Sequence, residues 1–451
     1  MKSKIHEKMV QDFRGLLKIN SVGGIDDISE QFPYGENVYA GIDYMKHLAL
    51  ADGFEIQEFD GHALAITLGE GAQRIDVVCH LDVVKPGVGW THEPFGAEVV
   101  GDLIYGRGAQ DDKGPAIVVY TALKEIKQKL QAGKITPLKR QLRVVFGCDE
   151  ERTMNDMKYY LLKAGEPTFA FTPDGFFPLS IGEKGALMWT LKSSISSVIQ
   201  SLDGGLQCNV VPPFARAILH GVDPETLRDC LQRENTVYEL EYVGEELLLS
   251  VKGKAAHASR PELGENAILR LLKSIAQASG DALSKMLYNT FADAYGVAAD
   301  MAIQSETMGR LTLNLGVLRI ENGELYAEVD CRYPMEGDAA KLTQLLNNQL
   351  HGITVALDYD AKPTLQDAFD PFIKILADNY RHWAKDDTNP PLISGGVSYS
   401  KVFQHCVAFG PHRPNDVSLA HQADECISIK EMKKLLQIYT QTMIDLSKDQ
   451  P

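Results

Sequence analysis

Four short apolar segments of this chain are each followed by side chains that could bind a metal ion. The segments and the side chains after them are IDVVC with His80 and Asp82, LRVVF with Glu150 and Glu151, TFAFT with Asp174, and CVAF with His421. Short apolar runs rich in Val and Phe predict buried strands. In open α/β sheets, ligands bind at the carboxyl ends of the strands. The pattern therefore predicts an α/β domain with these side chains at one edge of one sheet.

A second acidic motif lies between the first two of these segments. In GRGAQDDKGP, Asp111 and Asp112 precede the helical pattern AIVVYTALKEIKQKL. Negative charge is favoured at a helix N-terminus, so the pair has an ordinary explanation as a helix cap. That explanation suits Asp112 well. Asp111 is instead expected to bridge two cations.

Histidines and carboxylates dominate this set of side chains. The seven cysteines are odd in number and form no CxxC spacing, which argues against a thiolate metal site and against a disulfide framework. Mixed imidazole and carboxylate ligands suit zinc, manganese or cobalt. We expect two divalent metal ions, with zinc first and manganese or cobalt as alternatives.

The order of strand-like and helix-like segments changes in character twice along the chain. Residues 1–185 alternate strand and helix patterns, as in the first part of a three-layer α/β catalytic domain. Residues 186–359 contain alternating strands, the hairpin LTLNLGVLRI-ENGE-LYAEVDCRYP and three helical patterns. They predict an inserted α+β lid domain built on an antiparallel sheet. Residues 360–451 return to the α/β style and form the second part of the catalytic domain.

Composition excludes several classes of protein. The hydrophobic fraction of 44% is that of a globular chain. The net charge of −16 argues against nucleic acid as a partner, because binding to phosphates depends on Lys and Arg. No segment approaches the roughly 20 apolar residues of a membrane span, and the N-terminal MKSKIHEKMVQDFRG is charged throughout. We expect a cytoplasmic protein, monomer or homodimer, with no membrane partner.

Six ordered motifs resemble one enzyme family. They are CHLDVV (79–84), GRGAQDDKGP (106–115), CDEER (148–152), TPDGFFP (172–178), GKAAHASRPELGENA (253–267) and HQADE (421–425). The chain resembles the co-catalytic dizinc peptidases and acylases, which include carboxypeptidase G, aminoacylase and succinyl-diaminopimelate desuccinylase. It is most similar to the bacterial Xaa-His dipeptidase (dipeptidase V, carnosinase-like) group.

The resemblance assigns roles to the candidate metal-binding residues. The ligands it implies are His80 and Asp174 for one metal, Glu151 and His421 for the other, and Asp111 as the bridge. Glu150 would be the general base that takes a proton from a water between the metals. Asp82 would orient the His80 imidazole. The resemblance also implies a cis peptide bond between Asp111 and Asp112.

In the inserted domain the resemblance points to three further residues. His257 would polarise the scissile carbonyl, while Asn209 and Arg332 would hold the backbone and the terminal carboxylate of the substrate. Their ordinary explanations are a loop histidine, a turn cap and a surface ion pair. Lys401 departs from the family, whose dipeptidases commonly carry an arginine after the Gly-rich turn.

The expected activity is metal-dependent hydrolysis of short peptides, with dipeptides as substrates. An N-acyl amino acid deacylase or desuccinylase would use the same metal residues and remains an alternative. A catalytically silent metal-binding scaffold is a more remote one. The presence of Glu150 beside Glu151 argues against it, because losing the base would silence such a site.

Overall fold

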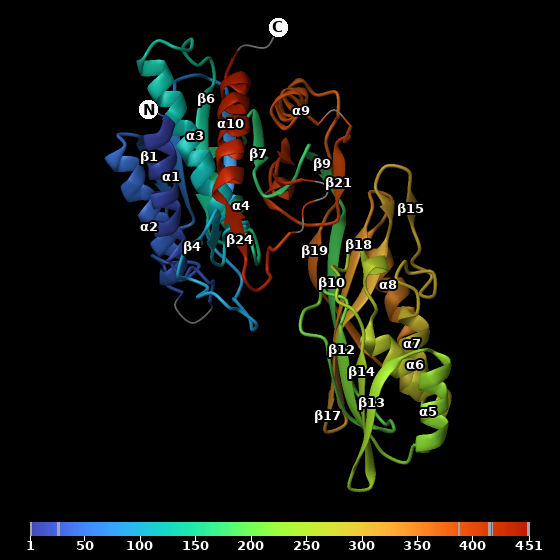
Figure 1. The fold of residues 1–451 in the computed structure, drawn as a ribbon. Coiled ribbons are helices and arrows are strands. Elements are labelled where there is room, and N and C mark those ends of the chain that lie inside the picture. Colours follow the sequence, from blue (N-terminus) through green and yellow to red (C-terminus); the bar gives the residue numbers. More distant parts are fainter. Residues whose placement is uncertain (1, 25–27, 387, 414–415, 417, 449–451) are drawn as a thin grey trace. The chain divides into compact units, whose positions relative to one another are not determined.

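The computed structural model describes residues 2–24, 28–386, 388–413, 416 and 418–448, and the chain divides into two compact units (Figure 1). Unit 1 comprises Met1–Gly182, Leu365–Ser394 and Ser398–Pro451. Unit 2 comprises Glu183–Thr364 together with Gly395–Val397. The chain passes from unit 1 to unit 2 between residues 182 and 183 and returns between 364 and 365, whereas the boundaries expected from the sequence are 185/186 and 359/360. A short segment of the Gly-rich turn also belongs to unit 2.

Unit 1 is built around a mixed sheet with the strand order β1-β2-β6-β3-β7-β22-β9-β20, and β21 pairs with β9. The strands are β1 (Glu55–Phe59), β2 (Ala63–Leu68), β3 (Arg74–His80), β6 (Gln141–Gly147), β7 (Phe169–Thr172), β9 (Ser180–Glu183), β20 (Thr364–Leu365), β21 (Leu392–Ser394) and β22 (Cys406–Ala408). The neighbours β6, β3, β7 and β22 run parallel. Their carboxyl ends therefore meet at one edge of the sheet.

Helices and short strands complete unit 1. The helices are α1 (Lys2–Leu17), α2 (Glu36–Ala51), α3 (Lys113–Gln131), α4 (Asn155–Ala164), α9 (Pro371–Ala384) and α10 (Ile429–Leu446), with the 3₁₀ turn η2 (Tyr399–Lys401). Two small sheets contain β4 (Glu98–Val100), β5 (Leu103–Tyr105) and β24 (Cys426–Ser428), and β8 (Gly175–Phe176) with β23 (Pro411–His412).

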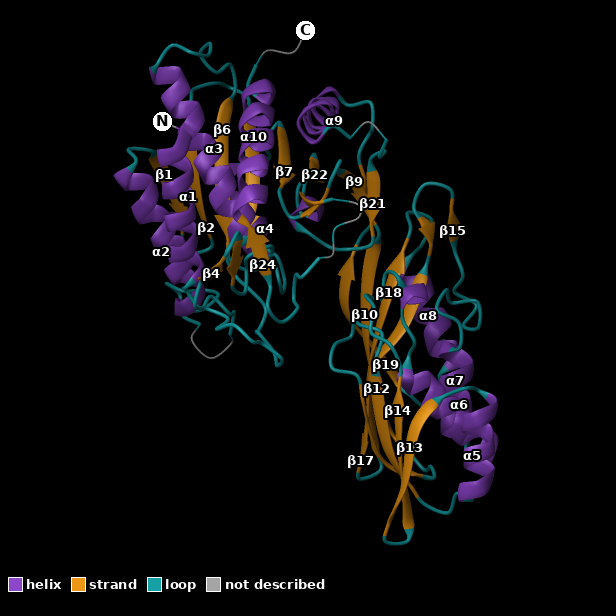
Figure 2. Cartoon of the chain, viewed as in Figure 1, coloured by secondary structure: helices purple, strands orange, loops and turns teal. Residues whose placement is uncertain are grey.

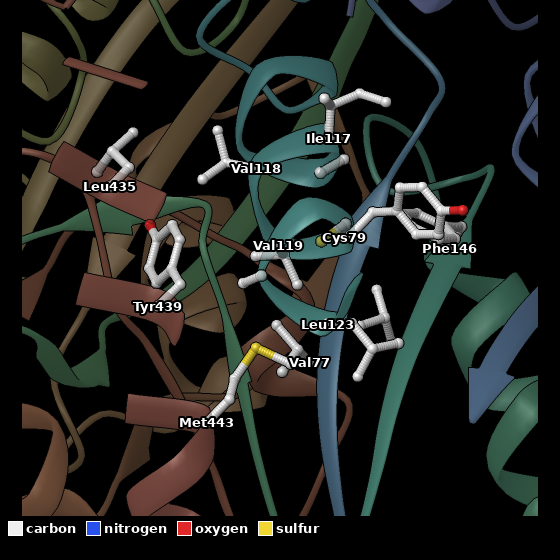
Figure 3. Close-up of a cluster of buried hydrophobic side chains, with 14 of the residues drawn as sticks. Val77, Cys79, Ile117, Val118, Val119, Leu123, Phe146, Leu435, Tyr439 and Met443 are labelled. Atoms are coloured by element: carbon white, nitrogen blue, oxygen red, sulfur yellow. The ribbon is translucent and has the colours of Figure 1, made fainter. Parts of the chain in front are cut away.

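Strand β3 is buried on both of its faces, which requires cover on both sides of the sheet. Val77 and Cys79 lie on the face covered by α3, and α10, which packs beside α3, contributes Leu435 and Tyr439 to the same cluster (Figure 3). The opposite face carries Asp76, whose carboxylate accepts the hydroxyl of Tyr160 from α4 at 2.7 Å. Unit 1 is therefore a three-layer α/β domain.

Unit 2 is built on an antiparallel sheet with the order β13-β14-β12-β11-β17-β18-β10-β19 (Figure 2). The strands are β10 (Gly185–Ser194), β11 (Ile199–Gly204), β12 (Phe214–Leu219), β13 (Val237–Val243), β14 (Glu246–Lys252), β17 (Thr312–Glu321), β18 (Glu324–Tyr333) and β19 (Thr354–Ala361), with the short pair β15 (Gln304–Ser305) and β16 (Gly309–Arg310) apart from them. The predicted hairpin is confirmed, because β17 pairs with β18 up to Glu321 and Glu324.

Four helices pack on this sheet and enclose the second hydrophobic core. They are α5 (Pro224–Arg233), α6 (Ala267–Ser279), α7 (Ala282–Phe291) and α8 (Ala339–Gln349), and the 3₁₀ turn η1 (Pro261–Leu263) precedes α6. The predicted fold class, an α/β catalytic domain with an inserted α+β domain on antiparallel sheet, is confirmed. Among the helices of the described ranges, none has the length and apolarity that crossing a membrane requires.

Candidate metal centre and substrate-binding residues

His80 is the last residue of β3 and is fully buried. Its Nε2 atom lies 2.9 Å from Oδ1 of Asp111, and its Nδ1 atom lies 2.9 Å from the backbone carbonyl of Asp82. A carbonyl can only accept a hydrogen bond, so the neutral ring carries its proton on Nδ1. Nε2 then carries the lone pair that a metal ion would use.

The Asp111 carboxylate lies between two imidazoles. Oδ1 faces His80 at 2.9 Å, and Oδ2 faces Nε2 of His421 at 3.0 Å. The next residue, Asp112, occupies the N-cap position of α3 but makes no side-chain cap bond there; its Oδ2 accepts the backbone N–H of His80 at 3.2 Å instead. The Asp111–Asp112 peptide bond is cis, which confirms the expectation from the resemblance. A carboxylate with a different imidazole at each oxygen can bridge two cations.

Glu150 and Glu151 lie in the turn that follows β6, and Asp82 holds this turn. The two Asp82 carboxylate oxygens accept the backbone N–H of Glu150 at 3.3 Å and that of Glu151 at 3.1 Å. The same carboxylate lies 3.5 Å from Nδ1 of His80. Asp82 therefore fixes the Glu-Glu turn against the end of β3, in addition to contacting the imidazole.

The side chains of the two glutamates differ in their contacts. Oε1 of Glu151 lies 3.0 Å from Nε2 of His421. Glu150 is 8% exposed, and its Oε1 has no hydrogen-bond partner among the described residues. Leaving a buried carboxylate oxygen without a partner is costly, so this atom is placed to meet a water, a substrate or a cation.

The ligand atoms fall into two overlapping groups. One contains His80, Asp111 and Glu151, the other contains His80, Glu150 and Asp174, and within each group the atoms lie within 4.8 Å of one another. Asp174 follows β7, with Oδ2 3.8 Å from Nε2 of His80. His421 adjoins the first group through its contacts with Asp111 and Glu151. The structure thus brings all five predicted metal ligands and Glu150 together in unit 1.

Negative charge dominates this cluster and shifts its pKa values. Burial raises the pKa of Glu150 well above its usual range, and the nearby carboxylates of Asp174 and Glu151 raise it further. Burial alone would lower the pKa of His421, but Glu151 and Asp111 raise it to about 11. One buried carboxylate, Glu150, and three half-buried ones gathered this closely call for additional positive charge, which divalent cations supply. The residues present therefore fit divalent metal ions.

Asn209 and His257 are neighbours within unit 2. Val210 and His257 form an isolated antiparallel bridge, and the amide after His257 donates to the Asn209 carbonyl at 2.8 Å. Asn314 of β17 donates its Nδ2 to the carbonyls on either side of Asn209, both at 3.0 Å. Backbone pairing thus joins two residues that are far apart in the sequence.

The His257 ring is exposed, but its surroundings select one tautomer. The backbone N–H of Ser259 donates to Nδ1 at 3.2 Å, and the Ser259 hydroxyl lies 2.7 Å from the same atom. A backbone amide can only donate, so Nδ1 is an acceptor and the neutral ring carries its proton on Nε2. His257 can therefore present an N–H donor at Nε2.

Arg332 lies in β18 and is 3% exposed. Its Nε and Nη2 atoms donate to the Asp330 carboxylate at 2.9 and 2.7 Å, and Nη1 donates to the Gly395 carbonyl at 3.3 Å. The ion pair predicted as its ordinary explanation is therefore present, although it is buried instead of lying on the surface. A guanidinium has five N–H groups, so two remain for a further acceptor.

Three residues that contact or adjoin these sites escaped the sequence analysis: Glu425, Ser259 and Asp156. Asp156 is fully buried, and its Oδ2 accepts the backbone N–H groups of Cys148 at 2.7 Å and Asp149 at 3.0 Å, just before the Glu-Glu turn. Glu425 lies inside the quoted motif HQADE, and Ser259 lies inside GKAAHASRPELGENA, so the position of both residues was available as a signal. Asp156 lies in an ordinary helical pattern and offered none.

Residues 77–445 match the model of Peptidase family M20/M25/M40. The chain belongs to this family. Among relatives, it is 32% identical over 462 residues to the "Putative dipeptidase YtjP" of Bacillus subtilis (strain 168), with 98% of each chain covered. As a member of the M20/M25/M40 family, the protein is a metallopeptidase.

Solved structures of low sequence identity support the fold of this family member. The crystal structure of human carnosine dipeptidase 1 has a TM-score of 0.63 at 12% identity and covers 98% of this chain and 96% of that one. A tripeptidase from Staphylococcus aureus subsp. aureus Mu50 has a TM-score of 0.57 at 16% identity and covers 98% of this chain and 99% of that one.

Proposed function

We propose that this protein is a dipeptidase that works with two divalent metal ions, zinc being the first expectation and manganese or cobalt the alternatives. The observation that carries the proposal is the Glu150 carboxylate, buried with an unpartnered Oε1 next to the metal-type residues His80 and Asp174. The B. subtilis relative, matched over 98% of its length, carries the name "Putative dipeptidase YtjP", which favours dipeptides as substrates.

The proposed ligand sets follow the contacts of Asp111. His80 and Asp174 would hold one metal ion, Glu151 and His421 the other, and Asp111 would contribute one oxygen to each. The approach of Asp111 to His80 at 2.9 Å and to His421 at 3.0 Å, from opposite oxygens, supports this division.

Bound metal ions would polarise the peptide carbonyl and lower the pKa of the attacking water. Glu150 would accept the proton of that water at Oε1 and return it to the leaving amine. The Asp82 carboxylate, bonded to the amides of Glu150 and Glu151, keeps the base and its neighbouring ligand in fixed positions.

The residues of unit 2 are proposed to act on the substrate, in the roles that the family resemblance implies. The N–H at Nε2 of His257 would donate to the carbonyl oxygen that becomes negative during attack. Asn209 would hold the peptide backbone. Arg332 would bind a terminal carboxylate through its two remaining N–H groups, because Asp330 and Gly395 occupy the others.

The test is a matched substrate panel measured with zinc, manganese and cobalt. The panel contains a dipeptide, the tripeptide that extends it, the dipeptide amide and the corresponding N-acetyl amino acid. We expect the dipeptide to have the highest kcat/KM, and both the tripeptide and the amide to be poor substrates. Treatment with a chelator should abolish turnover, and one of the three ions should restore it.

Two outcomes would contradict the proposal. Full turnover by thoroughly metal-free protein would eliminate the metal-dependent mechanism. Faster hydrolysis of N-acyl amino acids than of every free dipeptide would replace the dipeptidase by a deacylase that uses the same metal residues.

A further inference from the structure

Glu425 connects two segments of unit 1 that carry metal-type residues. Segment 106–111 ends at Asp111, and segment 419–426 contains His421. Glu425 belongs to the second segment, and its side chain has no exposed surface. A fully buried carboxylate is stable only where donors surround it, so its contacts define what it does.

The Glu425 carboxylate accepts four hydrogen bonds, all from the first segment. The donors are Gln110 N at 2.7 Å and Asp111 N at 3.3 Å on Oε1, and Arg107 Nη1 at 2.6 Å and Gly108 N at 3.1 Å on Oε2. Three of these donors are backbone amides of the loop that ends in Asp111. The carboxylate therefore fixes the path of that loop.

Further backbone and side-chain hydrogen bonds join the two segments, but these bonds do not involve Asp111, which Glu425 contacts directly. The amide of Gly106 donates to the Glu425 carbonyl at 2.8 Å, and the Gln110 side chain bonds to Leu419 N at 2.8 Å and to Cys426 O at 2.9 Å. The segment 419–426 is thus aligned with the loop at both of its ends. Between these ends lies His421, whose backbone has φ of 63°, a conformation that costs energy for a residue other than glycine.

The opposite side of Asp111 is held independently of Glu425. Asp112 accepts the backbone N–H of His80 at 3.2 Å and so ties the start of α3 to the end of β3. The approach of Asp111 to His80 therefore has its own restraint, whereas its approach to His421 depends on the two segments that Glu425 joins.

We propose that Glu425 is a positioning residue: its carboxylate sets the separation of Asp111 from His421 and so the affinity for the metal ion that Asp111, Glu151 and His421 would hold. This rests on the proposed function, which supplies the two metal ions. Residues that orient metal ligands typically contribute about 10- to 100-fold in metal affinity.

The geometry explains why glutamate is required. Aspartate keeps the charge that Arg107 needs, but it is one methylene shorter and reaches either the guanidinium or the amides of Gln110 and Asp111. Glutamine has the right length, but its NH₂ group would face an N–H donor, and Arg107, only 1% exposed, would lose its anion. The aspartate variant therefore isolates positioning from charge.

The experiment titrates the metal-free full-length protein with Co²⁺ and follows the absorption spectrum of the bound ion and the heat of binding. Wild-type protein should bind two equivalents. In Glu425→Asp, the second equivalent should bind about 10- to 100-fold more weakly while the first is unchanged. Hydrogen exchange of the Gln110 and Asp111 amides, measured without metal, should be faster in the variant. The adjacent Asp424→Asn is the matched control, because the hydrogen bonds of its side chain within the described ranges go to Thr91 and His92 and not to segment 106–111, and it should bind both equivalents as wild type does.

Unchanged affinities for both equivalents in Glu425→Asp, or equal weakening of both, would overturn the positioning role. Loss of the cooperative thermal transition in metal-free Glu425→Asp would also overturn it, because Glu425 would then be required for folding. Wild-type protein that binds fewer than two equivalents would instead refute the two-metal proposal, and the amide exchange would then decide the role of Glu425 alone.

Discussion

The candidate metal-binding residues of unit 1 are held in place differently from the candidate substrate-binding residues of unit 2. In unit 1, side chains hold the site: the carboxylates of Asp82 and Asp112 bind the backbone around Glu150 and His80, and both carboxylates are buried. In unit 2, backbone pairing places Asn209 beside His257, and the His257 ring itself is exposed. Ordering an exposed side chain costs entropy when substrate binds, whereas the two buried carboxylates of unit 1 are already ordered. Changes in unit 1 should therefore act on metal binding or proton transfer, and changes in unit 2 on turnover with the metals retained.

The largest effect is expected within the glutamate pair. Glu150→Gln should keep its metal content and lose about 10²-fold or more in kcat, because the proton acceptor is gone. Glu151→Gln should lose metal, because its carboxylate lies 3.0 Å from His421 at the proposed second metal position. Measuring the metal content of each variant together with its kcat distinguishes the two roles. Metal loss in Glu150→Gln with retention in Glu151→Gln would exchange their roles.

His257→Ala tests the other side of the comparison. Removing one donor to a developing oxyanion typically lowers kcat by about 10²-fold, and here the metal content should not change. The control is His351→Ala, an exposed histidine elsewhere in unit 2, which should turn over at the wild-type rate. A normal kcat in His257→Ala would reduce this histidine to a loop residue.

A smaller effect is expected for Ser259→Ala. The variant loses the hydroxyl contact at 2.7 Å but keeps the backbone donor to Nδ1. A single hydrogen bond contributes about 1 kcal/mol, so kcat should fall by roughly fivefold. The ¹⁵N chemical shifts of the ring should still show the proton on Nε2. A shift of the proton to Nδ1 would mean that the hydroxyl, and not the amide, selects the tautomer.

The smallest effect on turnover is expected for Asp156→Asn, which changes stability instead. Burial raises the pKa of Asp156 to about 7, compared with about 4 in an unfolded chain. The folded state then holds a proton that the unfolded state has released, so the free energy of unfolding should fall as pH rises from about 4 to about 7. Asparagine keeps an acceptor oxygen for the amides of Cys148 and Asp149, and it has no proton to lose.

Thermal unfolding of the metal-free protein at several pH values measures this difference. From the size of the pKa shift, the wild-type decrease due to Asp156 is at most about 4 kcal/mol. The midpoint of Asp156→Asn should change less with pH over the same interval. Parallel pH profiles for the two proteins would show that Asp156 is not the group responsible.

Local patterns were sufficient to predict the fold of unit 1 and the residues that come together in its candidate metal cluster. Apolar runs determine where parallel strands end, and the edge they share brings His80, Glu151 and Asp174 together without any knowledge of the loops. Glu425 lies in a quoted motif, but its contacts could not be predicted, because its ionic partner Arg107 is 318 residues away. No local pattern encodes a contact over that separation.

Arg332 shows a signal that could have been used. Asp330 lies two residues earlier, and in a strand such residues project from the same face. Pairing between them was therefore to be expected from DCR within a strand pattern. Helix α7 is a similar case: it was not among the predicted helices, although Asp281 caps it by accepting the backbone N–H of Ser284 at 2.8 Å.

Gly395–Val397 is the one short stretch of the Gly-rich turn that belongs to unit 2, while the chain on both sides of it belongs to unit 1. A side chain at Gly395 would collide with Cβ of Ser259, and the Gly395 carbonyl accepts from Arg332. Residues 183–364 therefore cannot be exchanged between relatives as one continuous segment. A chimera would have to transplant 395–397 as well, and a donor sequence with a bulkier residue at either contact position would need its own matching turn.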